Sequence, residues 1–331
     1  MSEERECSQG FDFEIPRVVD EIKKSGARKV MLQFPEGLRR SALWVSREIA
    51  KQTGLDVRVS GDSCFGSCDL CFVDDGTILV HFGHAPVDDD ENTIYVEARS
   101  YCALLPAAEA ALPLLKKNIG LVTTVQHAHR LHEVLPFLRE KGITALIGDG
   151  GGRTKYPGQV LGCNASAARK IASKVEQFLY IGGGMFHPLA VRLSVGKPVI
   201  AVDPFALEAQ DVEPVADRFL RRRHGAIERT SAAKRFGVLL CTKSGQRREA
   251  EAKRMMRLLE DKKRDAILLE VDEASPGHIA GFGLDAIVST ACPRLAIDED
   301  GMFGMPVLTP AELEIALSAR KWDDYELDQM D

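Results

Sequence analysis

The sequence predicts an α/β protein built from three similar units, each with a short parallel sheet. Short apolar runs rich in β-branched residues alternate with amphipathic helical stretches, which is typical of parallel βαβ construction. The same succession of strands and helices occurs three times along the chain. A length of 331 residues also suits two or three domains of ordinary size.

The first unit is predicted over residues 1–105 and opens with a strand at 29–34. A Pro35-Glu36-Gly37 turn follows the strand. The next segment is predicted to be a helix because apolar residues recur at helical spacing, at Leu38, Ala42, Val45 and Ile49. Further strands of this unit are predicted at residues 56–60, 78–82 and 93–97.

The second unit, residues 106–211, is predicted to follow the same course. Its helix at 131–139 places Leu131, Val134, Leu135 and Leu138 on one face. A second helix is predicted at residues 165–177. Its strands are predicted at residues 119–124, 144–148, 178–182 and 198–202.

The third unit covers residues 212–331. A helix is predicted from the inward spacing of Ala252, Met255, Met256 and Leu259, and another begins at Pro310. Strands are predicted at residues 236–241, 266–271, 285–289 and 306–308. The acidic tail after Trp322 is expected to be frayed.

Charge and composition argue against several classes of protein. The chain is 45% apolar and 28% charged, and 43 Lys and Arg against 49 Asp and Glu give a net charge of -6. This balance does not suit a protein that coats nucleic acid or an anionic membrane. The N-terminus lacks the pattern of a secretory signal, and Glu109 and two prolines interrupt the apolar stretch at 104–115. We therefore expect a cytoplasmic protein with no membrane span and no direct nucleic-acid partner.

A basic run lies between the second and third units. We expect it to be a solvated linker helix, with a contact surface for an acidic or ribonucleoprotein partner as the alternative. It comprises Arg218, Arg221, Arg222, Arg223, Arg229, Lys234 and Arg235.

The eight cysteines indicate metal binding or catalysis, because a reducing cytoplasm disfavours structural disulfides. Cys64, Cys68 and Cys71 form a compact C-x3-C-x2-C group. Its spacing resembles the loop with which radical S-adenosylmethionine enzymes hold a [4Fe-4S] cluster. The loop here follows the second strand of its unit, however, where that superfamily uses the first. A zinc site is a further alternative, with His81 or His84 as the missing ligand.

A second arrangement of cysteines follows from the rule that open parallel sheets bind ligands beyond the carboxyl ends of their strands. Cys68, Cys163 and Cys292 each lie in such a position, one in each unit, among glycines and prolines. Three units that face a common centre could place these thiolates around one cluster. Burial as a small hydrophobic residue is the alternative for each cysteine.

Seven short motifs are spread over all three units. They are LQFPEGL (32–38), CFGSCD (64–69), VHFGH (80–84), QVLGCN (159–164), GGGMFHPL (182–189), DPF (203–205) and TACPRLAID (290–298). These motifs resemble those of the archaeal enzymes that catalyse the first step of diphthamide biosynthesis, and the resemblance covers nearly the whole chain. The family's tyrosine-glycine-alanine-cysteine-aspartate motif matches Phe65-Gly66-Ser67-Cys68-Asp69.

The resemblance implies that Cys68, Cys163 and Cys292 hold one [4Fe-4S] cluster and leave one iron open to S-adenosylmethionine. The implied reaction is radical transfer of the 3-amino-3-carboxypropyl group to a histidine C2 carbon of translation elongation factor 2. The implied partners are this factor, an electron donor and a second copy of the chain in a homodimer. Cys64 and Cys71 depart from the family pattern, and no catalytic residue beyond the cluster ligands is expected.

Several polar residues and glycines after strands are predicted to contact S-adenosylmethionine. Bare backbone N–H groups in the 182–184 and 148–152 glycine runs favour a carboxylate, with tight turns as the alternative. Glu36 is expected either to meet the methionine amine or ribose or to cap a helix. His127, His129 and His132 form an H-x-H-x2-H pattern that fits zinc or a partly exposed helix start. The predicted cofactor-binding residues are Gln33, Glu36, His84, Gly183, Gly184 and His187.

The three units are expected in a pseudo-threefold arrangement around a central cleft at the carboxyl ends of their strands. Two other functions remain open. One is a dehydratase that resembles quinolinate synthase, in which a cluster with one cysteine per domain acts as a Lewis acid. The other is a non-catalytic metal-binding scaffold that recruits a partner through the basic run.

Overall fold

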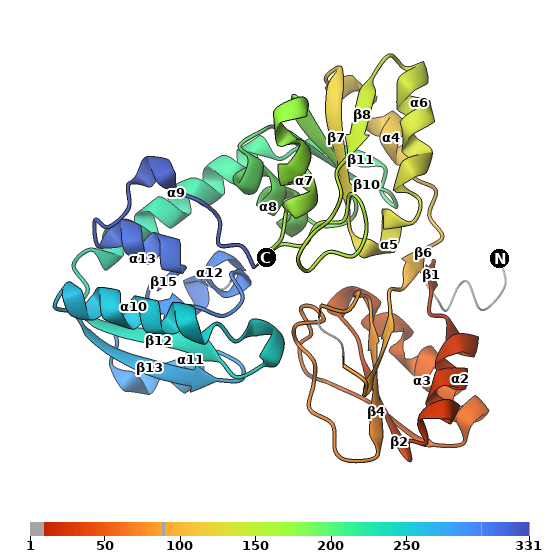
Figure 1. Cartoon of the computed structure of the whole chain (residues 1–331), viewed down its shortest axis with the longest axis horizontal. Coiled ribbons are helices and arrows are strands. Elements are labelled where there is room, and N and C mark those ends of the chain that lie inside the picture. Colours follow the sequence, from red (N-terminus) through yellow and green to blue (C-terminus); the bar gives the residue numbers. More distant parts are fainter. Residues whose placement is uncertain (1–9, 88–89, 299, 331) are drawn as a thin grey trace. The chain divides into compact units, whose positions relative to one another are not determined.

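The computed structural model describes residues 10–87, 90–298 and 300–330 of the chain. It contains several short parallel sheets covered by helices, which confirms the predicted α/β class (Figure 1). Within these residues, every helix is too short or too polar to span a lipid bilayer. Cys7, one of the eight cysteines, lies outside the described residues.

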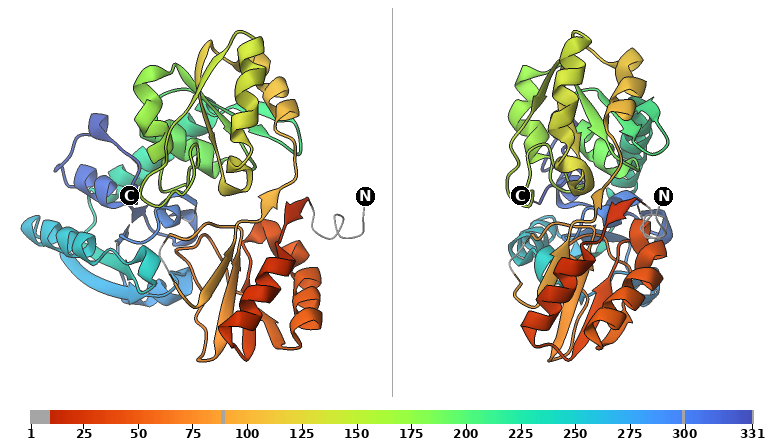
Figure 2. Two further views of the ribbon diagram at one scale, coloured as in Figure 1. Left: turned by 45° about the vertical axis from the view of Figure 1, so that its right-hand side comes forward. Right: turned by 90° about the vertical axis from the view of Figure 1, so that its right-hand side faces the viewer.

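The first sheet has the strand order β3-β2-β4-β5, and its pairs are parallel. Helices α2 and α3 lie beside one another over one face of this sheet, where their apolar residues join a single core with those of the strands (Figures 1 and 2). The elements are α2 (Ile15–Ser25), β2 (Lys29–Gln33), α3 (Ala42–Thr53), β3 (Asp56–Val59), β4 (Thr77–Phe82) and β5 (Thr93–Val96).

A short antiparallel pair joins β1, which precedes α2, to β6, which follows the last strand of the first sheet. The second sheet has the order β11-β10-β9-β7-β8. Apolar residues of α4 and α6 share one core with β7, β9 and β10. The elements are β1 (Phe11–Asp12), β6 (Arg99–Ser100), α4 (Leu105–Ala111), β7 (Asn118–Thr123), α5 (Val125–Ala128), α6 (Val134–Glu140), β8 (Thr144–Ile147), α7 (Ser166–Ile171), β9 (Gln177–Ile181), α8 (Phe186–Val195), β10 (Val199–Asp203) and β11 (Glu208–Asp211).

The third sheet has the order β13-β12-β14-β15, again with parallel pairs. Alternate residues of β12 face two cores: Val238 packs with α10 and α13, and Leu239 packs on the other face with Ile279 of α11. The elements are α9 (Glu213–Thr230), β12 (Arg235–Cys241), α10 (Glu249–Asp261), β13 (Asp265–Val271), α11 (Pro276–Ile279), β14 (Ala286–Ser289), α12 (Arg294–Asp298), β15 (Val307–Leu308) and α13 (Pro310–Ala316).

The three sheets repeat one strand order. In each, the first strand in sequence lies between the second and the third, and the fourth pairs with the third. The strand order therefore reverses between β2 and β4, between β7 and β9, and between β12 and β14. Such a reversal leaves a crevice at the carboxyl ends of the two strands, which is where open α/β sheets bind ligands.

The chain divides into two compact units. The first unit contains residues 1–160, 166–184 and 200–210, and with them most of the first two sheets. The second unit contains residues 161–165, 185–199 and 211–331, and with them the third sheet. The predicted boundaries at residues 105/106 and 211/212 and the predicted pseudo-threefold arrangement remain predictions.

The basic run differs from the predicted solvated linker helix. Most of it lies on α9, but Lys234 precedes β12 and Arg235 begins that strand. Arg223 is completely buried, and its guanidinium donates to both carboxylate oxygens of Glu312 at 2.8 and 2.6 Å and to the carbonyl oxygens of Ala296 and Val307. The prediction that Arg223 is solvated is wrong, because its charge is paired inside the second unit.

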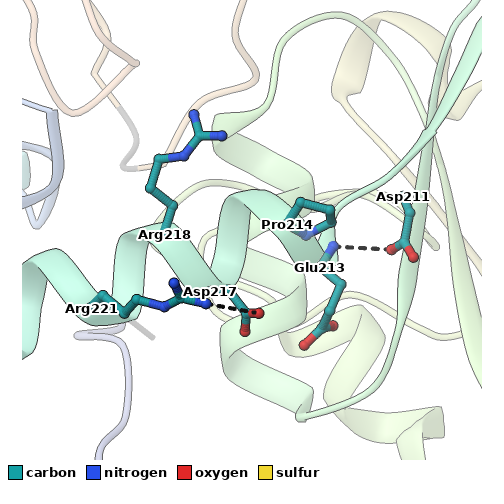
Figure 3. A pocket seen from close by; sticks show the side chains of 6 residues that line it. All are labelled: Asp211, Glu213, Pro214, Asp217, Arg218 and Arg221. Atoms are coloured by element: carbon teal, nitrogen blue, oxygen red, sulfur yellow. Dashed lines mark hydrogen bonds and ion pairs between the residues drawn. The ribbon is translucent and has the colours of Figure 1, made fainter.

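The start of α9 borders a surface hollow of about 450 Å³ in which both signs of charge are present (Figure 3). Arg221 lies 3.7 Å from Asp217, and the Glu213 backbone N–H donates to Asp211 at 3.0 Å. This mixture does not favour an acidic partner at the N-terminal end of the basic run.

Candidate functional site

A chain of hydrogen bonds lies at the carboxyl end of the first sheet, where the strand order reverses. Gln33 is the last residue of β2, and it is paired in register with His81 of β4. Gly83 follows β4 with a φ of 86°, a backbone conformation that suits glycine, and turns the chain toward His84. The structure thus brings two of the predicted cofactor-binding residues, Gln33 and His84, together with His81.

The hydrogen bonds define the tautomer of His81. Gln33 donates its Nε2 to the Asp69 carbonyl oxygen at 2.8 Å, and its Oε1 lies 2.8 Å from His81 Nδ1. His81 Nδ1 therefore carries the hydrogen. His81 is completely buried, and burial, with His84 as a second cause, holds its pKa well below the ordinary value. The ring is neutral, so its Nε2 accepts a hydrogen bond from His84 Nδ1 at 2.9 Å.

The cysteine loop lies next to this chain. Cys64 is buried, and burial, followed by the Asp69 carboxylate, raises its pKa to about 12. Cys64 Sγ and one ring nitrogen each of His81 and His84 lie within 4.8 Å of one another. Among the described residues, this is the one such group of three or more His, Cys, Asp or Glu donors.

Cys68, the predicted cluster ligand of the first unit, is half-buried in the same loop. Asp69 folds the loop back on itself: its carboxylate accepts from the Phe65 N–H at 3.0 Å, and its N–H donates to the Gly66 carbonyl oxygen at 3.0 Å. A Cβ at Gly66 would lie 3.2 Å from Cys68 Sγ. The absence of a side chain at Gly66 therefore leaves space around this thiol.

The C-terminal segment fixes the loop that carries Cys163. The Met330 N–H donates to the Cys163 carbonyl oxygen at 2.7 Å, and the Ala165 N–H donates to Gln329 Oε1 at 2.9 Å. Asn164 Nδ2 donates back to the Met330 carbonyl oxygen at 3.3 Å. The expectation of a frayed tail is wrong, because Leu327 and Met330 are buried and Asp328 pairs with Arg248 at 2.6 Å.

The segments around Cys163 and Cys292 both lie in the second compact unit, and both have Phe186 of α8 as a neighbour. A Cβ at Gly162 would overlap the Phe186 ring, and the Arg294 guanidinium lies 5.2 Å from the centre of that ring. His187 follows Phe186, and burial together with the nearby Arg294 charge lowers its pKa to about 4. Cys163, Cys292 and His187 thus belong to the same compact unit, and the imidazole of His187 is neutral at neutral pH.

The other predicted cofactor-binding residues lie at strand ends. Glu36 is exposed in the first turn of a short 3₁₀ helix that follows β2, and its side chain does not cap that helix. Gly183 and Gly184 follow β9, and the Gly183 carbonyl oxygen accepts from Tyr180 Oη at 3.2 Å. Gly184 has a φ of 73° and requires glycine for that reason.

Two sequence patterns have structural explanations. A Cβ at Gly148 would come within 2.0 Å of the Ala167 carbonyl oxygen, so that glycine permits the close approach of α7. His127 begins its pattern within the short helix α5, as the helix-start alternative predicts. It is buried, however, and the expectation of partial exposure is wrong for this residue.

The predicted cluster ligands have suitable donor chemistry for an iron–sulfur cluster. None of the seven cysteines in the described residues forms a disulfide, and Cys68, Cys163 and Cys292 are all half-buried rather than sealed in a core. Thiolates are the usual ligands of [4Fe-4S] clusters. These three residues therefore fit the group in donor type and exposure.

Comparison with known proteins identifies the family. Residues 34–326 match the family model described as "Putative diphthamide synthesis protein". The chain is 37% identical to 2-(3-amino-3-carboxypropyl)histidine synthase from Pyrococcus horikoshii, over 96% of this chain and 94% of the relative. It is 28% identical to subunit 1 of the human synthase, over 98% of this chain and 76% of that subunit.

A solved structure matches the fold as well as the sequence. The crystal structure of Dph2 from Pyrococcus horikoshii with a 4Fe-4S cluster superposes with a TM-score of 0.84 at 35% identity, covering 96% of this chain and 94% of that chain. The related synthases are transferases. The chain is therefore a transferase that belongs to the diphthamide synthesis protein family.

Proposed function

We propose that the chain is a 2-(3-amino-3-carboxypropyl)histidine synthase that catalyses the first step of diphthamide biosynthesis. Its substrates are S-adenosylmethionine and one histidine of translation elongation factor 2. The observation that supports this function best is the match over 96% of the chain to a structure that contains a 4Fe-4S cluster. The presence of Cys68, Cys163 and Cys292 as half-buried thiols agrees with it.

The three cysteines hold the cluster in this proposal and leave one iron without a protein ligand. When reduced, the cluster supplies the electron that breaks a carbon–sulfur bond of S-adenosylmethionine, which yields methylthioadenosine and a 3-amino-3-carboxypropyl radical. Imidazole C2 is a poor nucleophile, so polar alkylation would favour a ring nitrogen. A carbon radical adds to C2, and the ring recovers its aromatic character by losing one proton to solvent and one electron, which the oxidised cluster can accept.

The chain's own residues bind and orient the substrate in this proposal. Gln33, His84 and His187 offer hydrogen-bonding groups, and Glu36 offers a carboxylate for the methionine ammonium group. The turn at Gly183 and Gly184 offers backbone N–H groups for the methionine carboxylate. The acceptor histidine belongs to the elongation factor, so no catalytic histidine is required in this chain. An electron donor, a homodimer and a cytoplasmic location complete the proposal.

The test is anaerobic incubation of the reconstituted protein with elongation factor 2 and S-adenosylmethionine labelled at its carboxyl carbon. We expect label to enter the factor, and methylthioadenosine to form, only when dithionite is present. Label transfer in air without reductant, or methyl transfer, would show an ordinary alkyl or methyl transferase. A protein that consumes no S-adenosylmethionine would instead fit the dehydratase or scaffold alternatives.

A further inference from the structure

We propose that Cys64, His81 and His84 form a site for a divalent transition metal of the zinc type, separate from the three predicted cluster cysteines. Cys64 Sγ and one ring nitrogen of each histidine lie within 4.8 Å of one another. Cys64 and His81 are buried, and His84 is partly buried. This proposal goes beyond the transferase function and does not depend on it.

The surroundings of His81 match those of a metal-binding histidine. Such a residue usually donates its second ring N–H to a carbonyl or carboxylate oxygen, which fixes the ring orientation and leaves the other nitrogen for the metal. His81 Nδ1 donates to Gln33 Oε1 at 2.8 Å, and Gln33 is held in turn by the Asp69 carbonyl oxygen. His81 Nε2 therefore faces the cation.

The backbone around the site is well defined. His81 lies in β4, between β2 and β5 in the middle of the first sheet, and pairs in register with Gln33 and with Tyr95. Gly83 follows this strand with a positive φ, and His84 Nδ1, three residues after His81, lies 2.9 Å from His81 Nε2. The third donor comes from the loop that follows β3, so two different segments converge at this switch point of the sheet.

The donor set selects the metal. One thiolate and two imidazoles suit zinc, whereas magnesium and calcium require oxygen ligands. Zinc coordination requires small movements of the His81 and His84 side chains, because a hydrogen now lies between His81 Nε2 and His84 Nδ1. On binding, the Cys64 thiol proton leaves to solvent, and the His84 proton moves from Nδ1 to Nε2. No electron is transferred, and the fourth zinc position is filled by water or by a ligand.

The metal site is compatible with the predicted role of His84 in substrate binding. A cation on Nδ1 makes Nε2 the protonated nitrogen, which can donate to an anionic group such as the methionine carboxylate. The proposed zinc therefore changes which hydrogen-bonding partner His84 prefers, and it leaves Cys68 available to the cluster.

The experiment measures metal content and zinc-edge X-ray absorption on the full chain with its cluster reconstituted. After dialysis against micromolar zinc, we expect about one zinc per chain, with one sulfur near 2.3 Å and two nitrogens near 2.0 Å. Cys64→Ser and His81→Asn should each remove at least nine-tenths of this zinc. The iron content should remain that of the wild type, which separates failure of this site from failure of the proposed function.

Cys71→Ser is the matched control, because it removes a thiol from the same loop without touching the proposed donors. We expect it to retain its zinc. Zinc below one-tenth of an equivalent in the wild type would overturn the proposal, and so would a shell of three or more sulfurs. Retention of the zinc in Cys64→Ser together with its loss in Cys71→Ser would overturn it as well. His84→Asn gives a second way to remove a donor if His81→Asn does not fold.

Discussion

Burial lowers the pKa of several histidines and so changes their protonation in the range below neutral pH. His127 is 4% exposed, and its Nδ1 has no hydrogen-bond partner among the described residues. Burial, followed by the neighbouring His129, lowers its pKa to about 4, although Asp203 opposes the shift. In the folded protein, the His127 imidazole is therefore neutral at neutral pH.

The lowered pKa of His127 predicts how the stability of the fold depends on pH. The unfolded chain protonates His127 near pH 6.5, whereas the folded chain does so only near pH 4. Between these values the unfolded state binds more protons, so the free energy of unfolding falls as the pH falls from 6.5 to 4. His127→Gln should reduce this fall by about 3 kcal/mol, which urea denaturation at several pH values measures.

The histidine ring gives an independent measurement. Its NMR signal in the folded protein should titrate with a midpoint near 4. A midpoint near 6.5, or equal pH dependence of unfolding in the wild type and His127→Gln, would contradict the assignment.

The sequence predicts which residues lie at the ends of strands, but it does not predict which side chains they contact. The alternation of apolar runs predicts where β2 and β4 end, and hence the placement of Gln33 and His84. It does not predict that His81 links them, because that contact depends on the register between two strands. The partner of Arg223 could not be predicted either. The sequence of its helix suggests exposure to solvent, and Glu312, with which Arg223 pairs, is far along the chain.

At the scale of elements, the docked C-terminal segment has the clearest consequence. Residues 327–330 supply two buried side chains and three hydrogen bonds with the Cys163 loop. At about 1 kcal/mol per hydrogen bond and about 1.5–3 kcal/mol per buried apolar side chain, this attachment is worth several kcal/mol. The sequence pattern did not predict it, because Arg248 and the Cys163 loop are distant in sequence.

Removal of residues 327–331 should therefore loosen the Cys163 loop. We expect faster amide hydrogen exchange in a peptide covering residues 159–166, and unchanged exchange in a peptide from β4 of the first unit. Gln329→Ala removes one hydrogen bond and should give a smaller increase, equivalent to about 1 kcal/mol. Unchanged exchange at residues 159–166 in the truncated protein would show that the tail does not hold the loop.

At the scale of the whole molecule, one strand order occurs in three sheets, and functional candidates follow the carboxyl ends of their strands. Cys68 and Cys163 follow the second strand of their sheets in sequence, and Cys292 follows the third. Cys68 follows β3 in the first unit, whereas Cys163 and Cys292 both belong to the second unit. The sequence repeat predicted the sheets well, since apolar periodicity reports directly on burial in strands and helices. Which cysteines act together depends on tertiary structure, and the repeat alone does not determine it.

The central claim is that the cluster depends on Cys68, Cys163 and Cys292 rather than on the compact C-x3-C-x2-C loop. The most direct test is anaerobic reconstitution of single Cys→Ala variants, followed by iron counting and visible absorption. We expect Cys68→Ala, Cys163→Ala and Cys292→Ala to lose most of their iron, and Cys64→Ala and Cys71→Ala to retain the wild-type content. Loss of the cluster in Cys64→Ala and Cys71→Ala, with Cys163→Ala and Cys292→Ala unaffected, would contradict the claim.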